Sequence, residues 1–566
     1  MTTETLRVLE KTGKFQYFLL IVFAIPAFVA SSMALLFSWT GYSPYVRCRI
    51  PGLDPANSDV YSLPPPYNSS DMSRFYAKPT EEGQFCKYCP FNGTIGVNCD
   101  TGIDCDHGYI LDMQDSVIYD TLVQRFSMAC SDVYKKNIVW TLTTFGIFCS
   151  APLWAWISDR FGRRMAALLS IGFGVIIYFS YALADNFYVY CIYTFLANGC
   201  SYGTYMTTYV ILMESLNDSA RTWLGPLMQN FGTFAELYVG LIAFLCRRWK
   251  IIHLVVAAPS ILLLTYYWVC PESILWLLAT GKTQRARDAI KFACRLNNMP
   301  EEEVDYSKHS RDRSMSDAPH RPRSASVLSI NFTHVTVLDM FKNWRSTYVT
   351  LVVWFKWFAI IMCYFGLAQN TADLQGDPFQ AWTYSALAEI PGSFMAVLTM
   401  QYLGRKPATV ISFVVAGVSC IVSGVLSNPT AKLTLALFGR AWCLGGTLIV
   451  YNYTMELFPT VIRQTATTIG SVCGRFGAML APSVRYALGP NVGESFPIIT
   501  YGSVCTLAGI LCLVLPETKG KVPPETVEDA LVLYGAPKKR ERPPSYNSFV
   551  MTEQPSHQNG SVSEKF

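Results

Sequence analysis

The sequence predicts an all-α membrane protein whose twelve transmembrane helices form two six-helix halves that repeat each other. Only 15% of its 566 residues are charged, against roughly 25% in soluble globular domains, and 51% are hydrophobic. The apolar residues lie in long runs, and a helix needs about 20 such residues to cross a bilayer. Motifs also recur at one constant spacing along the chain. These observations argue against an ordinary water-soluble enzyme.

The apolar runs can be placed one by one, and the segments between them define the domains. The first run is too long for the core of a signal peptide and is expected to stay as an anchor. The predicted domains are a cytosolic N-terminus at 1–14, an N-terminal half at 15–270, a cytosolic loop at 271–346, a C-terminal half at 347–515 and a cytosolic tail at 516–566. The predicted spans are 15–37, 137–157, 166–184, 187–209, 222–245, 251–270, 347–368, 381–400, 408–426, 432–454, 465–487 and 494–515.

Clustered cations in short loops predict the orientation. Arg160, Arg163 and Arg164 follow the second span, and Arg405 and Lys406 follow the eighth. Such loops lie on the cytosolic side of membrane proteins. Because the number of spans is even, both termini are expected to be cytosolic.

The segment 38–136 is then an extracellular loop. Its two glycosylation sequons begin at Asn68 and Asn92, and they indicate a plasma membrane protein. Outside the cell the loop's cysteines favour three disulfides of unknown pairing, although the spacing of Cys86 and Cys89 also fits a zinc site of a cytosolic protein. The six cysteines are Cys48, Cys86, Cys89, Cys99, Cys105 and Cys130.

Two cytosolic segments carry short motifs. Ser326 follows basic residues at Arg321 and Arg323, which suits a basophilic kinase or is a chance match in a polar linker. In the tail, Pro543, Pro544 and Tyr546 match the motif that WW domains bind. The tail is therefore expected either to bind a WW-domain ubiquitin ligase or to be a bystander. No feature indicates nucleic acid as a partner.

The repeat predicts the function class. Asp159 corresponds to Gln401, Gly203 to Gly445 and Glu214 to Glu456, each with an offset of 242 residues. Six-span repeats of one orientation place a binding site at midplane where the halves meet, as in a carrier for small organic ions. The alternative is a cell-surface receptor or scaffold that moves nothing. The sequence has no phosphate-binding glycine loop, metal-spaced histidine pair or hydrolase elbow, so neither an enzyme nor a cofactor or metal is expected.

Acids and bases recur together at the predicted cytosolic ends of the helices. Such pairs can join neighbouring helices and hold the cytosolic side closed, whereas orientation alone would need only the bases. Because Gln401 stands where the second half should carry an acid, the second latch is expected to be weaker. The predicted gating residues are Asp159, Arg160, Gly162, Arg163, Glu214, Arg221, Gly404, Arg405, Glu456 and Arg463.

These motifs resemble those of the major facilitator superfamily and, within it, the organic cation, anion and zwitterion transporter family of solute carriers. The resemblance covers about residues 6–529 and includes the six-cysteine loop after the first span. It departs from the family pattern at Phe195, where an arginine is usual. The segments that carry it are Ser158 to Arg164 (SDRFGRR), Pro271 to Leu277 (PESILWL), Glu456 to Arg463 (ELFPTVIR) and Pro516 to Lys521 (PETKGK).

Arg475 is the first candidate for substrate binding. It lies inside the eleventh span among small residues such as Gly474 and Gly477, which are expected to leave space beside it. A guanidinium can hold a carboxylate with two hydrogen bonds. The resemblance implies that this position is acidic in cation carriers and arginine in anion and carnitine-type carriers. The alternative is a salt bridge from Arg475 to Glu389 or Glu236.

Further candidates lie at similar depth. Lys356 in the seventh span is expected to face the cavity, because a lysine at midspan snorkels poorly. Glu389 and Glu236 either neutralise Arg475, Lys356 and Arg440 or bind an ammonium group. Trp357 and Tyr364 either face that cation through their rings or are simply packed. We therefore expect organic anions as substrates, with carnitine- or betaine-type zwitterions second and organic cations third.

Overall fold

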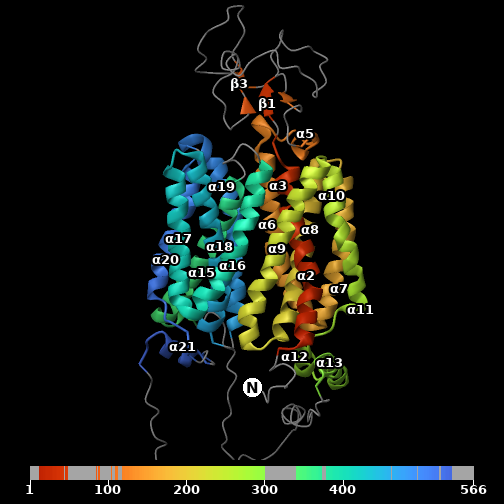
Figure 1. Cartoon of the computed structure of the whole chain (residues 1–566), viewed down its shortest axis with the longest axis vertical. Helices are drawn as coiled ribbons and strands as arrows, with labels where there is room; N and C mark the ends of the chain where they lie inside the picture. The colour runs from red at the N-terminus through yellow and green to blue at the C-terminus, as the bar shows by residue number, and fades with distance from the viewer. Residues whose placement is uncertain are drawn as a thin grey trace, which may run out of the picture.

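In the computed structural model, the chain forms a bundle of long helices with short strands beyond one end (Figure 1). We call that end the strand-bearing end, and we call the opposite end, where helices α12, α13 and α21 lie, the α13 end. The structure describes residues 12–43, 45–48, 84–85, 87–88, 103–104, 109–112, 118–299, 340–371, 378–459, 462–493, 495–521, 524 and 526–537.

The first half of the bundle runs up and down between the two ends. Polar side chains start two of its helices: Asn186 and Asn217 each accept a backbone N–H in the first turn. The elements are α2 (Lys14–Leu35), α3 (Phe37–Thr40), α6 (Tyr134–Phe161), α7 (Arg163–Ser180), η2 (Tyr181–Leu183), α8 (Phe187–Glu214), α9 (Asp218–Cys246), α10 (Trp249–Ala257), η3 (Ala258–Thr265) and α11 (Tyr266–Val269).

The second half repeats this pattern beside the first. Its helices pack mainly on one another, while α9 contacts α16 and α6 contacts α19 across the boundary between the halves. The elements are α15 (Trp344–Thr371), α16 (Pro378–Tyr402), α17 (Arg405–Val425), α18 (Pro429–Leu457), α19 (Arg463–Val492), α20 (Phe496–Leu511) and η5 (Cys512–Val514).

Eight helical segments of the described chain are long and apolar enough to cross a membrane. The helices α8, α9, α16 and α19 overlap further predicted spans but are not among the eight. Each of these four carries polar side chains on the face toward the boundary between the halves, including Tyr202, Glu236, Glu389 and Arg475. Their lower hydropathy therefore follows from where they lie in the bundle.

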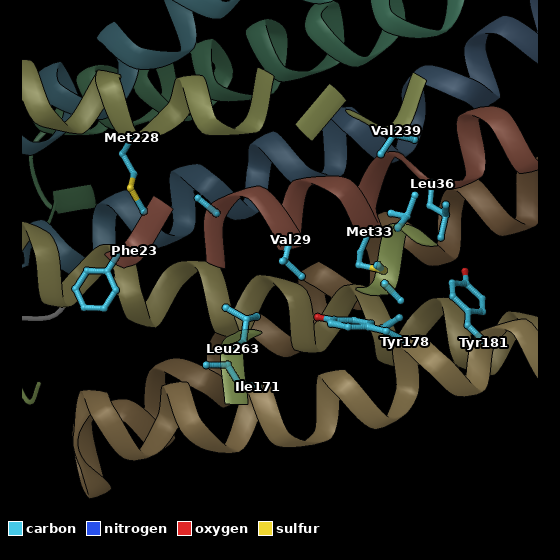
Figure 2. Packing of buried hydrophobic residues seen from close by; sticks show 14 of the residues in the cluster. Phe23, Val29, Met33, Leu36, Ile171, Tyr178, Tyr181, Met228, Val239 and Leu263 are labelled. Atoms are coloured by element: carbon cyan, nitrogen blue, oxygen red, sulfur yellow. The ribbon is translucent and has the colours of Figure 1, made fainter. Parts of the chain in front are cut away.

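Each half has a hydrophobic core, and the core of the first half extends to Trp382 on α16 of the second half. In the first half, side chains of α2, α7 and α9 meet those of η3, among them Phe23, Ile171, Met228 and Leu263 (Figure 2). In the second half, a separate core joins α15, α17, α18, α19 and α20. Because close-packed interiors resist deformation, each half can move as a unit.

Short strands modify the expected all-α architecture. The strands β1 (Tyr45–Cys48) and β5 (Tyr109–Asp112) pair antiparallel, and β2 (Gln84–Phe85) pairs parallel to β1. Further strands are β3 (Lys87–Tyr88) and β4 (Ile103–Asp104), and a short helix α5 (Leu122–Arg125) follows. The β-branched and aromatic residues of β1 and β5, among them Tyr45, Val46, Tyr109 and Ile110, favour strands. Cys48 and Cys130 are both disulfide-bonded.

The α13 end carries helices outside the bundle. The helices α12 (Ile274–Ala279) and α13 (Thr283–Leu296) follow the first half, and α21 (Val527–Leu533) follows the second. The helical spacing of the basic residues in 282–295 is confirmed, because α13 buries Ala286, Ile290 and Ala293 on its opposite face. Asn297, just after α13, accepts a hydrogen bond from the Phe15 backbone N–H at the start of α2 (2.8 Å).

Candidate functional site

A buried cluster of charges joins the two halves. Arg440 Nη2 of α18 lies 2.8 and 2.9 Å from the carboxylate oxygens of Glu236 on α9, and 2.8 Å from Glu389 Oε1 on α16. The three residues are only 1–2% exposed. The sequence left open whether the two acids neutralise cations or bind an ammonium group. In the structure they neutralise Arg440.

Neutral hydrogen-bond donors complete this charged cluster. Tyr364 donates its hydroxyl to Glu389 Oε1 (2.7 Å), and Thr233 donates to Glu389 Oε2 (2.9 Å). Arg440 also lies over the Tyr364 ring, 5.2 Å from its centroid. Tyr364 therefore faces the guanidinium of the protein's own Arg440, and its predicted contact with a substrate ammonium group stays a prediction.

The charged cluster lies toward the strand-bearing end. Glu389 and Arg440 lie about three turns after the starts of α16 and α18, and Glu236 lies about three turns before the end of α9. Nearer that end, Trp39 stacks on Phe379 across the boundary, with ring centroids 4.4 Å apart. The halves are thus in contact from the charged cluster up to the strand-bearing end.

Arg475 lies between the halves at a different level. Its guanidinium is 5.4 Å from the ring centroid of Tyr202 on α8, about three turns from the α13 end of each helix. Among the described side chains, no carboxylate forms an ion pair with Arg475, and Glu236 and Glu389 are occupied by Arg440. The side chain is half-buried. The predicted alternative of a salt bridge to either glutamate is not formed in this conformation.

The small residues beside Arg475 have another role than expected. A Cβ atom on Gly477 would lie 2.4 Å from the carbonyl oxygen of Phe358, and one on Gly474 would lie 3.0 Å from Ile361. The glycines therefore let α19 pack closely on α15, and they do not leave space beside the guanidinium.

The structure places Lys356 and Trp357 apart from Arg475 and from the charged cluster. Lys356 Nζ is fully buried and lies 4.2 Å from the ring centroid of Tyr453 on α18, without a hydrogen-bond partner among the described residues. Trp357 donates its indole N–H to Thr454 Oγ1 (3.1 Å). The position of Lys356 in the sequence indicates its depth in the span but not the face of α15 on which it lies. In the structure it lies on the face that packs into the core of its own half.

Lys356→Met is therefore expected to raise thermal stability. Burying an ammonium group costs several kcal/mol, whereas a desolvated cation–π contact returns about 2 kcal/mol. We expect a net gain of about 1–4 kcal/mol, seen as a higher unfolding temperature of the purified protein. Loss of substrate uptake by correctly folded Lys356→Met would instead place the lysine in the substrate path.

At the α13 end, the predicted gating residues of the first half form a network around Arg163. Its guanidinium lies 2.7 Å from Asp159 Oδ1 and 3.1 Å from Glu214 Oε1. The neighbouring Arg160 lies over the exposed Trp156 ring, 5.8 Å from its centroid.

The second half forms the equivalent network. Arg405 Nη2 lies 2.9 Å from Glu456 Oε1, and Thr518 donates its hydroxyl to Glu456 Oε2 (2.5 Å). The pairs Arg163–Glu214 and Arg405–Glu456 span the same 51 residues of sequence. Gln401 supplies no acid to the second network, so Arg405 lacks the counterpart of Asp159.

Each of these ion pairs stays within one half. Among the described side chains, none of them links the two halves at the α13 end. They join neighbouring helices, as predicted, within the same half, and their role in holding the cytosolic side closed stays a prediction. The side chains of Arg221 and Arg463 lie outside the described residues.

Two acids that the sequence showed only as repeated motifs complete the networks. Glu272 accepts the Arg164 backbone N–H (3.1 Å), and Glu517 accepts that of Lys406 (3.0 Å). Burial alone would raise the pKa of Glu517, but backbone N–H groups, including those of Lys519 and Arg405, hold its pKa below the usual range. The carboxylate therefore stays ionised near neutral pH. The repeat of Pro-Glu in both halves was the available signal.

A glycine is required at position 162, because the Glu272 carboxylate lies close to the backbone there. Its φ is +113°, and an added Cβ would lie 2.4 Å from Glu272 Oε2. We expect Gly162→Ala to destabilise the protein by about 1–3 kcal/mol and to lower surface expression. The control is Gly172→Ala in α7, where nothing lies within 4 Å and an alanine should be neutral or stabilising. Equal expression of both variants would contradict this role.

Several sequence predictions lie outside the described residues. They are the cysteines Cys86, Cys89, Cys99 and Cys105, the sequons at Asn68 and Asn92, the kinase motif at Ser326 and the tail motif at Pro543, Pro544 and Tyr546.

The sequence is similar to that of known transporters. A family model described as "Sugar (and other) transporter" matches residues 107–528. Solute carrier family 22 member 3 of Rattus norvegicus is 30% identical over 427 residues, which cover 73% of this chain and 72% of that protein. Solute carrier family 22 member 12 of Rattus norvegicus is 27% identical over 541 residues, covering 91% and 93%. The organic cation transporter protein of Drosophila melanogaster is 26% identical over 529 residues, covering 92% and 93%.

A solved structure shares the fold. The proton:xylose symporter XylE, bound to 6-bromo-6-deoxy-D-glucose, aligns with a TM-score of 0.58 at 15% identity, covering 92% of this chain and 99% of that one. The described helices therefore have the arrangement of the major facilitator superfamily. The chain belongs to solute carrier family 22, a family of transporters within that superfamily.

Proposed function

We propose that the protein carries organic anions across the plasma membrane, with the substrate carboxylate bound by Arg475. The observation that carries this proposal is the contrast between two arginines at the boundary of the halves. Arg440 is neutralised by two glutamates, whereas Arg475 contacts Tyr202 and has no described carboxylate partner. An arginine held half-buried in this way can offer its guanidinium to a substrate.

The transport step follows from the two separate cores. The halves touch from the charged cluster to the strand-bearing end, and the ion pairs of the α13 end stay within each half. We propose that this conformation opens at the α13 end, that this end is cytosolic, and that rocking of the halves exposes Arg475 to either side. In this proposal all twelve helical segments cross the bilayer, and both termini are cytosolic.

A zwitterionic substrate is the second candidate, and the charge of the cluster favours it. Two glutamates and one arginine carry a formal net negative charge, and they lie one to two turns nearer the strand-bearing end than Arg475. A betaine- or carnitine-type molecule can place its carboxylate at Arg475 and its cation toward the charged cluster. One relative is an organic cation transporter protein of Drosophila melanogaster, which keeps a simple cation as a third outcome.

Uptake into cells tests the proposal. An aromatic carboxylate, a betaine-type zwitterion and a quaternary ammonium ion are supplied as radiotracers to cells that express the protein and to empty-vector cells. We expect the carboxylate to accumulate. Uptake of only the ammonium ion would overturn the assignment to Arg475, and absence of all uptake despite surface expression would favour a receptor or scaffold.

The loop and tail add proposals that rest on sequence. We propose that the loop 38–136 is disulfide-stabilised and glycosylated at Asn68 and Asn92. We also propose that the tail motif ending at Tyr546 recruits a WW-domain ubiquitin ligase, and that a kinase modifies Ser326. A longer surface half-life of Tyr546→Phe would support the ligase.

A further inference from the structure

The charged cluster contains one acid more than it has bases. Glu236 and Glu389 would carry two negative charges when ionised, and Arg440 supplies one positive charge. All three are at most 2% exposed, so water does not screen the excess charge. An uncompensated charge in such surroundings is very costly, and proteins normally remove it by binding a proton or a counter-ion.

Among the described residues, the groups that hydrogen-bond this cluster supply no second cation. The hydroxyls of Tyr364 on α15 and Thr233 on α9 are neutral, and the Trp382 indole on α16 donates to the Glu236 backbone carbonyl (2.8 Å). The buried Lys356 lies beside Tyr453 instead, and the half-buried Arg475 lies beside Tyr202.

The hydrogen bonds distinguish the two acids. Three side chains donate hydrogen bonds to Glu389. Arg440 and Tyr364 donate to its Oε1 atom, and Thr233 donates to its Oε2 atom. Among the described residues, the Glu236 carboxylate accepts hydrogen bonds only from Arg440 Nη2. Donors stabilise the ionised form of a carboxyl group. Glu236, which has fewer donors, is therefore the better place for a proton.

We propose that Glu236 is a proton-binding site and that its protonation allows the halves to close at the strand-bearing end. A proton suits the geometry better than a metal cation, because a neutral Glu236 carboxyl can still accept a hydrogen bond from Arg440 and needs no further ligand. When the halves part, Glu236 separates from Arg440 and Glu389, which lie in the other half, and can ionise in water. Closure then requires that one proton be taken up again. This inference rests on the proposed function, because it assigns a coupling or gating ion to that carrier.

The first test measures the initial rate of carboxylate uptake at external pH 5.5, 6.5 and 7.5. The rate is expected to rise as pH falls, by up to tenfold per pH unit for a single proton. Glu236→Gln mimics the protonated form and should transport with a flat pH profile. Thr233→Val is the matched control: it removes a donor to Glu389 without changing the charge count and should keep the slope.

Two results would overturn the proposal. One is a flat profile in the wild type, or a slope that Glu236→Gln retains. The other is uptake that falls when external sodium is replaced by N-methyl-D-glucamine but does not respond to pH, which would assign the charge balance to a sodium ion.

A second readout needs no substrate and separates this inference from the proposed function. Spin labels at Leu183 and Val425, near the strand-bearing ends of α7 and α17, report the separation of the halves in purified protein. Lower pH is expected to shift the wild type toward the short distance, and Glu236→Gln should show it at every pH. A pH shift in a protein without uptake would refute only the substrate assignment. No pH shift would refute the proton site.

Discussion

Arg440→Met is expected to leave little folded protein at the cell surface. The substitution would leave Glu236 and Glu389 buried at 1–2% exposure without the one ion-pair partner that the described part of the chain gives them. Breaking a buried pair in this way costs about 3–5 kcal/mol, a large part of the total stability of a typical domain. Surface biotinylation and the unfolding temperature of the purified variant measure the effect.

Two further variants make this prediction specific to charge. The triple variant Glu236→Gln, Glu389→Gln and Arg440→Met removes all three charges and should recover much of the lost expression. Arg345→Met, which removes an exposed hydrogen bond from Arg345 to the Gly535 carbonyl (2.6 Å), should leave expression unchanged. Normal expression of Arg440→Met, or no recovery in the triple variant, would show that the charged cluster does not hold the halves together.

Arg475→Ala is expected to abolish carboxylate uptake while surface expression stays normal. No described carboxylate depends on this arginine, so its removal leaves no buried charge unpaired. Removing one partner of a hydrogen-bonded charge pair costs about 2–5 kcal/mol, which lowers substrate affinity at least about 30-fold.

The control for this prediction is Arg475→Lys, which keeps the charge but loses the planar fork. It should retain weak uptake with a raised KM. Full uptake by Arg475→Ala would show that the arginine is structural and that its contact with Tyr202 only packs α19 against α8.

The repeat could be predicted from sequence because its signals are local. Arg163 and Glu214 recur as Arg405 and Glu456 at one spacing, and the structure forms both pairs in the same way. The loops that contain Gly162 and Gly404, both at positive φ, also belong to this repeated motif. Which helices these ion pairs connect could not be predicted, because the spacing of motifs does not show whether a neighbouring helix belongs to the same half.

The contacts of the buried charges were harder to predict for the same reason. Sequence gives the depth of Lys356 and Arg440 in their spans but not the face on which each lies. Arg440 faces α9 and α16, whereas Lys356 faces Tyr453 within its own half. The packing of Gly477 on Phe358 likewise depends on which helix is adjacent. Such contacts are set by tertiary packing.

We expect the two ends of the bundle to open and close in opposite senses, and pairs of spin labels measure this motion. Leu183 and Val425 are equivalent in the repeat and are 75% and 71% exposed near the strand-bearing end; Phe161 and Leu403 are equivalent and are 52% and 51% exposed at the α13 end. Labels are best attached through an encoded amino acid, because the chain has 18 cysteines. With a transported carboxylate added, we expect one distance to lengthen as the other shortens. Distances that stay fixed, or that change in the same sense at both ends, would contradict it.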